Sequence, residues 1–410
     1  MSLWATSPTA SKAKIEAMRI GAMLITAAVL RAQPSQELDS VQKIRVRMAF
    51  HLTHQPNYTC LETIERSFRP SQAQKFKPVD TLRLEVALVD GKEMFGWPGS
   101  RSFEDSDVTK LVNSGAIGSG DFGAHAKALF SSRIANFHYR GVVTFRGKDA
   151  IKVDYDVPQM LSGYTLKVGR ASAIVGYHGT FYADAATYDV IRIEVMVDSI
   201  PPLLALSATS DVIEYAAVRI GAGDFLLPSE SELHMIGLGG AENANRMTFS
   251  SCKEFLGESV LTFEEPVPAK PEASPVAPRQ FDLPKGLDFY ITLTEELDLA
   301  SAAIGDPVHA RLGQDLKYNG EVLVRKGAAV RGRLMHLEKH DNYSVVGIRF
   351  NEIDAPGIEA RFQGGLTQIF GASPVRGRIV LPQKLPGEGI FAVPSSQTRL
   401  ARGCMMYWRS

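Results

Sequence analysis

The sequence predicts a mainly β protein: an antiparallel curved sheet or half-barrel with a few helices, followed by a small C-terminal β-barrel. Alternating apolar residues, punctuated by Gly, Asn and Asp, indicate strands and turns along two long segments. Between these segments, Glu265–Pro278 contains five prolines and no aromatic residue. Because proline lacks a backbone donor and favours extended neighbours, this stretch can enter neither a helix nor a sheet interior. As polyproline II it would span roughly 40 Å as a semi-rigid spacer.

We therefore expect four parts: a signal-like segment (1–34), a curved β-sheet domain (35–262), a Pro-rich linker (263–280) and a small β-barrel domain (281–410). In the first part, Arg19 precedes the apolar run Ile20–Leu30, and Ala32 follows at a position suited to cleavage. This order is typical of a secretory signal peptide, and the run is too short to cross ~30 Å of hydrocarbon. The alternative is a buried helix of a cytosolic protein. We favour an exported protein of the periplasm or cell envelope, with no transmembrane span in its mature chain.

The three cysteines of the chain test this interpretation. Cys60 and Cys252 lie in strand-like stretches that bracket almost all of the predicted curved sheet. If the first and last strands are neighbours, the two thiols could form a disulfide in an oxidising compartment, which would contribute about 4–5 kcal/mol in the loop-entropy model. The alternative is two small buried hydrophobic residues. Cys404 is left over, and no Cys/His spacing indicates zinc.

In the first domain, a helix is predicted over Ser35–Leu52, because Leu38, Val41, Ile44 and Met48 recur at intervals of three and four residues. Stretches rich in β-branched or aromatic residues predict strands, interrupted by one more helix at Gly123–Ser132. These strands are Tyr58–Ser67, Thr81–Val89, Lys92–Trp97, Phe137–Phe145, Lys148–Val157, Gly176–Ala183, Val190–Val197, Ser210–Arg219, Phe225–Ile236 and Ala244–Leu256. So many strands without regular helical crossovers favour an antiparallel curved sheet.

One stretch of this domain, Gly179–Glu194, has the pattern of a hairpin with Asp184 and Thr187 at its turn. Both side chains suit a turn because they bond nearby backbone N–H groups. Together with Tyr215–Pro228, which ends in Leu-Pro, this stretch resembles the hairpins of the LolA/LolB/MucB-like superfamily of envelope lipoprotein carriers. The resemblance implies a half-closed sheet around an apolar concavity, with helices as its lid.

Such a concavity would suit an acyl chain or the lipid anchor of another protein, bound by apolar burial. The candidate lining residues are Leu38, Val41, Ile44 and Met48 on one face of the predicted helix. The alternative is that these residues belong to an ordinary core. The expected partners are a lipid or lipoprotein and other envelope proteins.

In the second domain, three glycines that each follow a basic residue, Gly286, Gly327 and Gly403, predict tight turns. The predicted strands are Leu287–Leu293, Ala302–Leu312, Ala328–Leu337, Val345–Ile353 and Cys404–Trp408. With Gly305-Asp306 before one strand and Lys326–Gly332 around another, this part resembles the small β-barrel of TrbI-like conjugation-channel proteins. Only the barrel is implied, because the family's membrane anchor and channel-forming insertion are not recognisable.

The remaining motifs give little indication of chemistry. Lys+Arg and Asp+Glu number 45 each, so the basic excess of a nucleic-acid-binding protein is absent. Gly118–Gly123 matches GxGxxG without a βαβ context, which favours a loop. His336, Glu338 and His340 would share one strand face, either as metal ligands or, as we favour, as a solvated strand end.

No set of nucleophile, base and orienting group is evident in the sequence. We therefore predict a non-catalytic protein without cofactor or metal. It would bind an apolar ligand or lipid anchor in its first domain. The alternative is a structural or assembly component that docks other envelope proteins and holds no small ligand.

Overall fold

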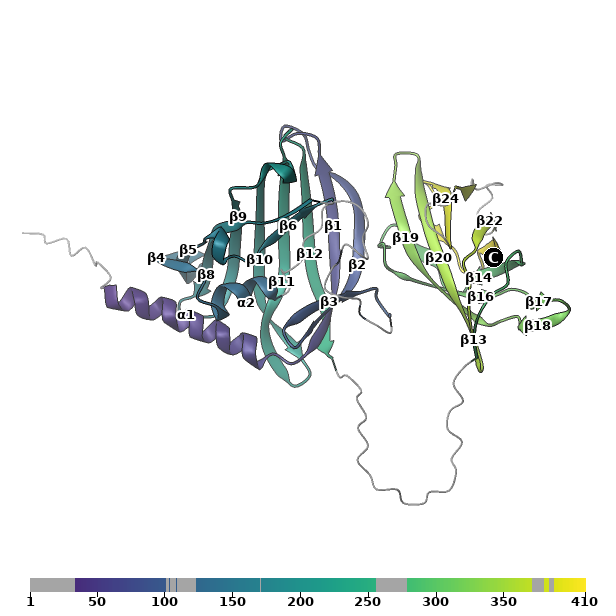
Figure 1. Cartoon of the computed structure of the whole chain (residues 1–410), viewed down its shortest axis with the longest axis horizontal. Coiled ribbons are helices and arrows are strands. Elements are labelled where there is room, and N and C mark those ends of the chain that lie inside the picture. The colour runs from purple at the N-terminus through teal and green to yellow at the C-terminus, as the bar shows by residue number, and fades with distance from the viewer. Residues whose placement is uncertain are drawn as a thin grey trace, which may run out of the picture.

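The computed structural model describes residues 34–100, 103, 108, 123–169, 171–255, 279–370, 380–382 and 387–410. The signal-like segment before residue 34, the Pro-rich linker up to residue 278 and the GxGxxG motif before Gly123 lie outside the described residues. The described chain forms one large sheet in an N-terminal region (34–255) and another in a C-terminal region (279–410) (Figure 1). The curled, half-barrel N-terminal sheet and the few helices confirm the predicted fold class. The domain boundaries stay a prediction.

The N-terminal sheet is antiparallel, with strand order β3-β2-β1-β12-β11-β10-β9-β8-β5-β4. Its strands are β1 (Tyr58–Arg69), β2 (Lys77–Val89), β3 (Lys92–Gly96), β4 (Asn136–Phe145), β5 (Lys148–Val157), β8 (Gly176–Asp184), β9 (Val190–Asp198), β10 (Leu206–Ile220), β11 (Gly223–Gly237) and β12 (Glu242–Glu254). The predicted strands of this region are present. Consecutive strands mostly pair with each other, as expected for hairpin connections.

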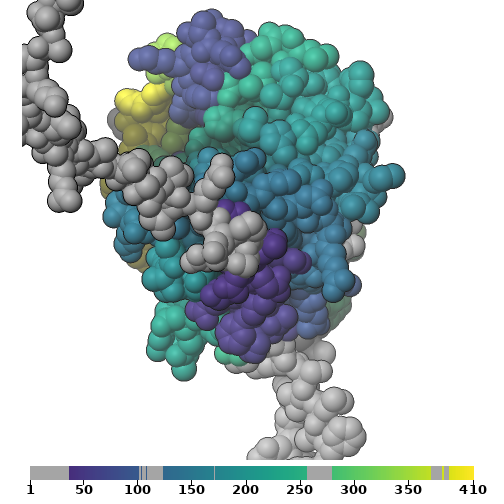
Figure 2. All heavy atoms as spheres, turned by 90° about the vertical axis from the view of Figure 1, so that its left-hand side faces the viewer, coloured from purple at the N-terminus to yellow at the C-terminus, as the bar shows by residue number. Residues whose placement is uncertain are grey.

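Two α-helices, α1 (Pro34–His54) and α2 (Ala124–Ser131), cover one face of this sheet, which we call its inner face. Figure 2 shows α1, in purple, on the outside of the region. Ile44 and Met48 of α1 are completely buried against the inner face, which follows from their spacing of four residues. Both predicted helices are confirmed. The short elements of the region are β6 (Thr165–Val168), β7 (Ala171–Ile174) and the 3-10 turns Gln159–Leu161 and Pro202–Leu204.

The first and last strands of the sheet, β1 and β12, pair side by side in the middle of the strand order. A β-bulge near Thr59 brings Cys60 opposite Cys252, and the structure joins them in a disulfide across 192 residues of sequence. Ser251 in the bulge has a φ of 52°. The third cysteine, Cys404, belongs to no disulfide and is buried in the C-terminal region. The disulfide therefore links the strands that come first and last in the sequence of this sheet.

The turn between β8 and β9 contains the side-chain hydrogen bonds to backbone N–H groups predicted for Asp184 and Thr187. Asp184 Oδ1 accepts hydrogen bonds from the backbone N–H groups of Ala186 and Thr187, at 2.8 and 3.0 Å. Thr187 Oγ1 accepts one from the N–H group of Asp189 at 3.3 Å. These bonds satisfy backbone donors that the strands leave free, so the turn residues hold the hairpin.

The C-terminal sheet has the strand order β13-β21-β20-β19-β16-β14-β26-β22, and β24 pairs with both β20 and β23. Its strands are β13 (Arg279–Asp282), β14 (Asp288–Leu293), β16 (Pro307–Leu312), β19 (Ala329–Lys339), β20 (Tyr343–Ala355), β21 (Ile358–Arg361), β22 (Gly365–Phe370), β23 (Val380–Leu381), β24 (Glu388–Pro394) and β26 (Met405–Arg409). A small hairpin pairs β17 (Leu316–Tyr318) with β18 (Glu321–Val324), and a separate two-stranded sheet pairs β15 (Leu297–Asp298) with β25 (Arg399–Leu400).

The C-terminal sheet encloses a core of aromatic and aliphatic side chains that includes Phe289, Phe350 and Trp408. The three predicted glycine turns are confirmed, because Gly286, Gly327 and Gly403 have φ values of 86°, 88° and 89°. Such values suit glycine, which has no Cβ to clash. The resemblance to the TrbI-like barrel stays a prediction.

The two regions contact each other where β2 faces β19 (Figure 1). Ile304 forms a parallel bridge with Leu82. Its N–H group donates to the Thr81 carbonyl at 2.8 Å, and its carbonyl accepts from the Arg83 N–H group at 2.7 Å. The Arg83 guanidinium also contacts both carboxylate oxygens of Asp306 at 2.7 Å. The C-terminal region thus adds a short strand-like pairing to the part of β2 that β3 leaves uncovered.

A second arginine strengthens this contact from the C-terminal side. Arg333 donates to the carbonyl oxygens of Pro98, at 3.0 Å, and Gly305, at 2.5 Å, and lies over the Trp97 ring. Burial lowers the pKa of Arg333 to about 10, so the guanidinium remains charged at neutral pH. Gly305 has a φ of 106°, and a Cβ there would collide with the Arg83 carbonyl and the Trp97 ring. The contact is close-packed.

Candidate functional site

A row of polar side chains crosses the inner face of the N-terminal sheet. Strand register places Asp211 of β10 opposite Leu233 of β11, and Leu233 opposite Asn245 of β12. Asn245 in turn lies opposite Arg66 of β1, and Arg66 opposite Asp80 of β2. We call Asp80, Arg66, Asn245 and Asp211 the polar row. Asp211, Asn245 and Arg66 are buried, with exposed fractions of 3%, 2% and 6%.

Arg66 and Asp80 form a two-pronged ion pair inside this row. Arg66 Nε lies 2.6 Å from Asp80 Oδ1, and Arg66 Nη2 lies 2.5 Å from Asp80 Oδ2. The planar guanidinium matches a carboxylate in this geometry. Removing two charges from water nevertheless costs free energy that their attraction repays only in part. Such a pair adds little net stability relative to apolar residues of similar size.

The next row of the sheet is almost entirely apolar. The same register aligns Ile213, Ser231, Met247, Ile64 and Leu82 across β10, β11, β12, β1 and β2. Only Ser231 carries a polar side-chain group among these five. Along β10, β12, β1 and β2 the inner face thus changes from polar to apolar within two residues, because alternate residues share a face.

An aromatic cluster continues the apolar surface toward β5 and β8. The Phe130 ring of α2 lies 5.2 Å from Phe181, and Tyr155 lies 6.2 Å from Tyr177. His125 of α2 packs 5.2 Å from Tyr177. Burial lowers the pKa of His125 to about 4, so its imidazole is neutral at pH 7. Its Nε2 atom has no hydrogen-bond partner within the described part of the chain.

Helix α1 is fastened over the inner face at the turn between β8 and β9. Arg47 Nε and His51 Nε2 lie 2.6 and 2.7 Å from the same carboxylate oxygen of Asp189. Burial would raise the pKa of Asp189, but the hydrogen bonds from Arg47 and His51 outweigh this effect and lower it. One carboxylate therefore anchors the C-terminal half of α1, while Ile44 and Met48 fill the space beneath the helix.

The four predicted lining residues differ in their burial. Ile44 and Met48 are buried, with exposed fractions of 0% and 1%, and Val41 packs against the same core. Leu38 is 74% exposed and is not part of the buried core. Three of the four therefore contribute to the inner face. Whether they line a ligand remains a prediction.

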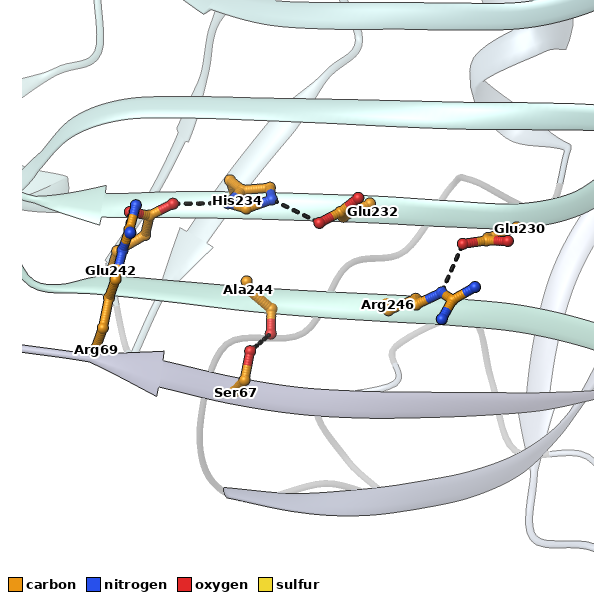
Figure 3. Close-up of polar contacts among 8 residues, drawn as sticks. All are labelled: Ser67, Arg69, Glu230, Glu232, His234, Glu242, Ala244 and Arg246. Atoms are coloured by element: carbon orange, nitrogen blue, oxygen red, sulfur yellow. Dashed lines mark hydrogen bonds and ion pairs between the residues drawn. The ribbon is translucent and has the colours of Figure 1, made fainter. Parts of the chain in front are cut away.

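The outer face of the same sheet carries a different polar arrangement. Glu242 of β12 accepts hydrogen bonds from Arg69 Nε at 2.7 Å and from His234 Nδ1 at 2.7 Å, and His234 Nε2 contacts Glu232 at 3.0 Å (Figure 3). Arg246 and Glu230 pair at 2.6 Å farther along. We call Arg69, Glu242, His234 and Glu232 the outer chain. It links β1, β12 and β11, so it fastens the strands that the disulfide also joins.

The outer chain shifts the acid–base behaviour of its members. Burial would lower the pKa of His234, but its hydrogen bonds to Glu242 and Glu232 outweigh burial and raise it. Burial would likewise raise the pKa of Glu242, and its bonds to His234 and Arg69 instead lower it. Both shifts favour the charged forms, so the outer chain acts as a salt-bridge network.

Sequence reasoning missed the polar row altogether. Arg66 and Asp80 stand at positions that also suit solvent-facing residues of an alternating strand, and Asp211 and Asn245 lie far away in sequence. One signal was present, because Arg66 follows Ile64 by two residues and therefore shares its face. Which face is covered depends on tertiary packing, which the alternation alone does not reveal.

The other candidate positions do not assemble into a site. His336 and His340 contact the two oxygens of Glu338 at 3.4 and 3.2 Å, and the His340 ring stacks on Tyr343. Among the described residues, no group of three or more His, Cys, Asp or Glu side chains could hold a metal ion. No helix in the described part of the chain is long and apolar enough to span a bilayer.

The sequence matches no protein-family model and no curated protein. Among solved structures, a putative outer membrane lipoprotein-sorting protein domain from Vibrio parahaemolyticus is 13% identical, with a TM-score of 0.29 over 53% of this chain and 92% of its own. A LolA superfamily protein from Nitrosomonas europaea is 10% identical, with a TM-score of 0.29 over 54% of this chain and 96% of its own.

The lipoprotein LppX from Mycobacterium tuberculosis is 10% identical, with a TM-score of 0.20 over 53% of this chain and 98% of its own. Likenesses this weak identify neither a family nor a ligand.

Proposed function

We propose that the N-terminal region is a non-catalytic binding module of an exported cell-envelope protein. It would hold an amphipathic ligand, either a lipid or the lipid anchor of another protein, against the inner face of its sheet. The observation that carries this proposal is the polar row, which lies buried beside an apolar row and an aromatic cluster. A face that only packs helices needs no charged residues, and burying them costs free energy.

An amphipathic ligand would match both parts of this face. Its apolar chain would lie on the aromatic cluster and the apolar row, where burial contributes roughly 25 cal/mol per Å². Its polar head would exchange hydrogen bonds with the polar row, because charged and amide side chains there offer both donors and acceptors. The polar row would therefore set the orientation of the ligand, and the apolar surface would supply most of its affinity.

Helix α1 would have to move for a chain to enter, since Ile44 and Met48 occupy the space beneath it. Its attachment suits such a motion, because Arg47 and His51 both depend on the single carboxylate of Asp189. Arg45 also donates to the Ser132 carbonyl at 3.4 Å. Breaking these few polar contacts is a smaller step than unfolding a sheet, and lids in general belong to the less stable parts of a protein. We propose α1 as the lid of the site.

The test compares two substitutions on the same helix. Met48→Trp adds bulk beneath α1, whereas Val46→Trp adds it on the 58% exposed outer side. Delipidated protein would be titrated with a fluorescent fatty acid, and protein from its native envelope would be weighed by native mass spectrometry before and after lipid extraction. We expect Met48→Trp to weaken probe binding at least tenfold and Val46→Trp to leave it unchanged.

A bound lipid mass that disappears on extraction would support the proposal. Absence of both a lipid mass and probe binding in correctly folded wild-type protein would refute it. If Met48→Trp fails to fold, Asp189→Asn provides the second measurement, because loosening the lid should change the rate of probe entry without filling the site.

A structural or assembly role is the second candidate. It is favoured by the outer side of α1, where Leu38, Val46 and Phe50 are 74%, 58% and 49% exposed. Exposed apolar side chains on one helix suit a protein partner. Native mass spectrometry distinguishes the two, because this role predicts an added protein mass that Val46→Asp removes and lipid extraction does not.

A further inference from the structure

A groove of about 710 Å³ opens on the C-terminal sheet, where the outward-facing residues of three neighbouring strands meet. Thr292 of β14 lies opposite Arg311 of β16, and His309 of β16 lies opposite Arg331 of β19. All four side chains line the groove. Alternation places them outside the sheet, because the residues between them, such as Val308 and Ala310, belong to the core.

Two turns close one end of this groove. Thr294 and Glu295 follow β14, while Arg402 and Gly403 precede β26. Backbone hydrogen bonds hold the turns together, since the Gly403 N–H group donates to the Leu293 carbonyl at 2.9 Å. A third arginine, Arg402, thereby lines the same space as Arg311 and Arg331. The groove is thus built on paired strands and on turns that backbone hydrogen bonds hold together.

The lining is cationic, with three arginines and a single acidic residue, Glu295. Arg331 is neutralised by Asp354, with 2.5 Å between Nη2 and Oδ2. Arg311 and Arg402 differ, because neither forms an ion pair or a side-chain hydrogen bond with any described residue. Most other arginines of the described chain have such a partner, so two guanidinium groups remain available to a ligand at this place.

Arg311 and Arg331 can reach one ligand together. Arg311 lies opposite Ala329, two residues from Arg331, so the two arginines are diagonal neighbours on adjacent strands. Such neighbours are roughly 7–8 Å apart, within reach of long side chains. The small side chain of Ala329 leaves room between them. An anion entering the groove would therefore meet more than one guanidinium.

We propose that this groove binds a phosphate-type oxyanion, held by Arg311 and Arg402 with the hydroxyl groups of Thr292 and Thr294 as additional donors. Guanidinium groups present planar sets of N–H donors that match phosphate oxygens in pairs. The volume exceeds that of a single phosphate and accommodates a phosphorylated small molecule or a lipid headgroup. The site is separate from the inner face of the N-terminal sheet and does not depend on the function proposed for that face.

The experiment titrates the full chain with inorganic phosphate and follows the side-chain Nε–H resonances of arginine by NMR. We expect saturable shifts in the wild type and roughly tenfold weaker binding in Arg311→Gln and in Arg402→Gln, because each substitution removes charged hydrogen bonds. Added sodium chloride should weaken the binding. Arg325→Gln is the matched control, since Arg325 is exposed in the same region and does not line the groove.

A second arm distinguishes the sources of the phosphate group. Phosphatidylcholine vesicles with and without phosphatidylglycerol are sedimented with each variant. Binding to the anionic vesicles that Arg311→Gln and Arg402→Gln abolish assigns the site to a lipid headgroup, whereas phosphate binding without vesicle binding assigns it to a soluble phosphate. The proposal is overturned if phosphate fails to bind, or if Arg325→Gln weakens binding as much as Arg311→Gln does. Thermal unfolding checks that all three variants are folded.

Discussion

The two large sheets of this protein enclose their interiors in different ways. The C-terminal sheet surrounds a core of aliphatic and aromatic side chains, with Trp408, Phe350 and Phe391 almost completely buried. The N-terminal sheet carries a polar row on the face that its helices cover. Of the twelve polar side chains that are buried in the described residues, ten belong to the N-terminal region.

This difference indicates that polar burial is not a requirement of curling a sheet. The C-terminal sheet curls around an interior that is almost wholly apolar, as a structure selected for stability would. The N-terminal sheet accepts a cost that such packing avoids. Polar residues that lie together in a position where apolar residues would pack as well are candidates for function. The polar row of the inner face is such a group.

The largest expected effect concerns the disulfide, which only the N-terminal sheet contains among the described residues. Cys60→Ala together with Cys252→Ala should lower the free energy of unfolding of that region by about 2–5 kcal/mol, because the unfolded chain loses a long cross-linked loop. Urea denaturation with and without reductant measures the loss. Cys404→Ala is the control, and its response to reductant should equal that of the wild type. A wild type whose stability ignores reductant while its free thiols rise from one to three would contradict the expectation.

The next largest effect concerns the Arg66–Asp80 pair and tests whether the polar row serves the fold or ligand binding. Arg66→Met should destabilise the N-terminal region by about 3 kcal/mol, because the Asp80 carboxylate would stay buried without its guanidinium partner. Arg66→Met combined with Asp80→Leu should recover most of that loss, as replacing both members of a buried pair often does. Urea unfolding measures both variants.

Ligand binding gives the second half of this test. If the row orients a ligand, the stable double variant should still lose binding of the fluorescent fatty acid. A double variant that binds normally would show that the pair serves the fold alone. A double variant that is as unstable as Arg66→Met would instead show that other members of the row depend on the pair.

The sequence predicts a large part of this fold because the decisive information is local. The spacing of Ile44 and Met48 predicts α1 and its buried side, and Asp184 and Thr187 predict their turn from their own hydrogen-bonding capacity. The polar row is different, since it exists only after five strands have paired in register. Likewise, nothing near Arg83 in the sequence indicates a bond to Asp306.

A smaller effect is expected where the two regions meet. Gly305→Ala should weaken the contact by about 1–2 kcal/mol, because alanine is strained at a φ of 106° and its Cβ would strike the Arg83 carbonyl. Small-angle scattering of the full chain should show a larger radius of gyration in this variant. Gly320→Ala is the control, since it replaces a glycine with a φ of 87° that has open space around it. Identical scattering from both variants would argue against the contact in solution.

The smallest effect concerns the outer chain and depends on pH. Because its pKa is raised in the folded protein, His234 stabilises fully below its unfolded pKa, and this contribution is lost as the pH rises through the folded value. Glu242 has a lowered pKa, so its contribution is lost as the pH falls through its folded value. The outer chain should therefore contribute most at pH values above the unfolded pKa of Glu242 and below the unfolded pKa of His234.

His234→Gln should remove the loss at the alkaline side and cost about 1 kcal/mol or less near neutrality, because the network is partly exposed. Urea midpoints measured from pH 4 to 9 provide the comparison. The matched control is His178→Gln, whose exposed partner Asp198 lies at 2.7 Å outside the outer chain. Equal pH profiles for His234→Gln and the wild type would contradict the assignment.

The pairing of Ile304 with Leu82 has a consequence for the edge of β2. Strand β3 pairs with β2 only from Glu85 onward, and among the described residues Ile304 supplies the edge partner of the Thr81–Arg83 stretch. In the order of the chain, β12 ends at Glu254, and Ile304 follows 50 residues later, beyond the last strand of the N-terminal sheet. Free strand edges pair readily with other chains. Docking of the C-terminal region therefore protects this edge of β2 from pairing with another chain.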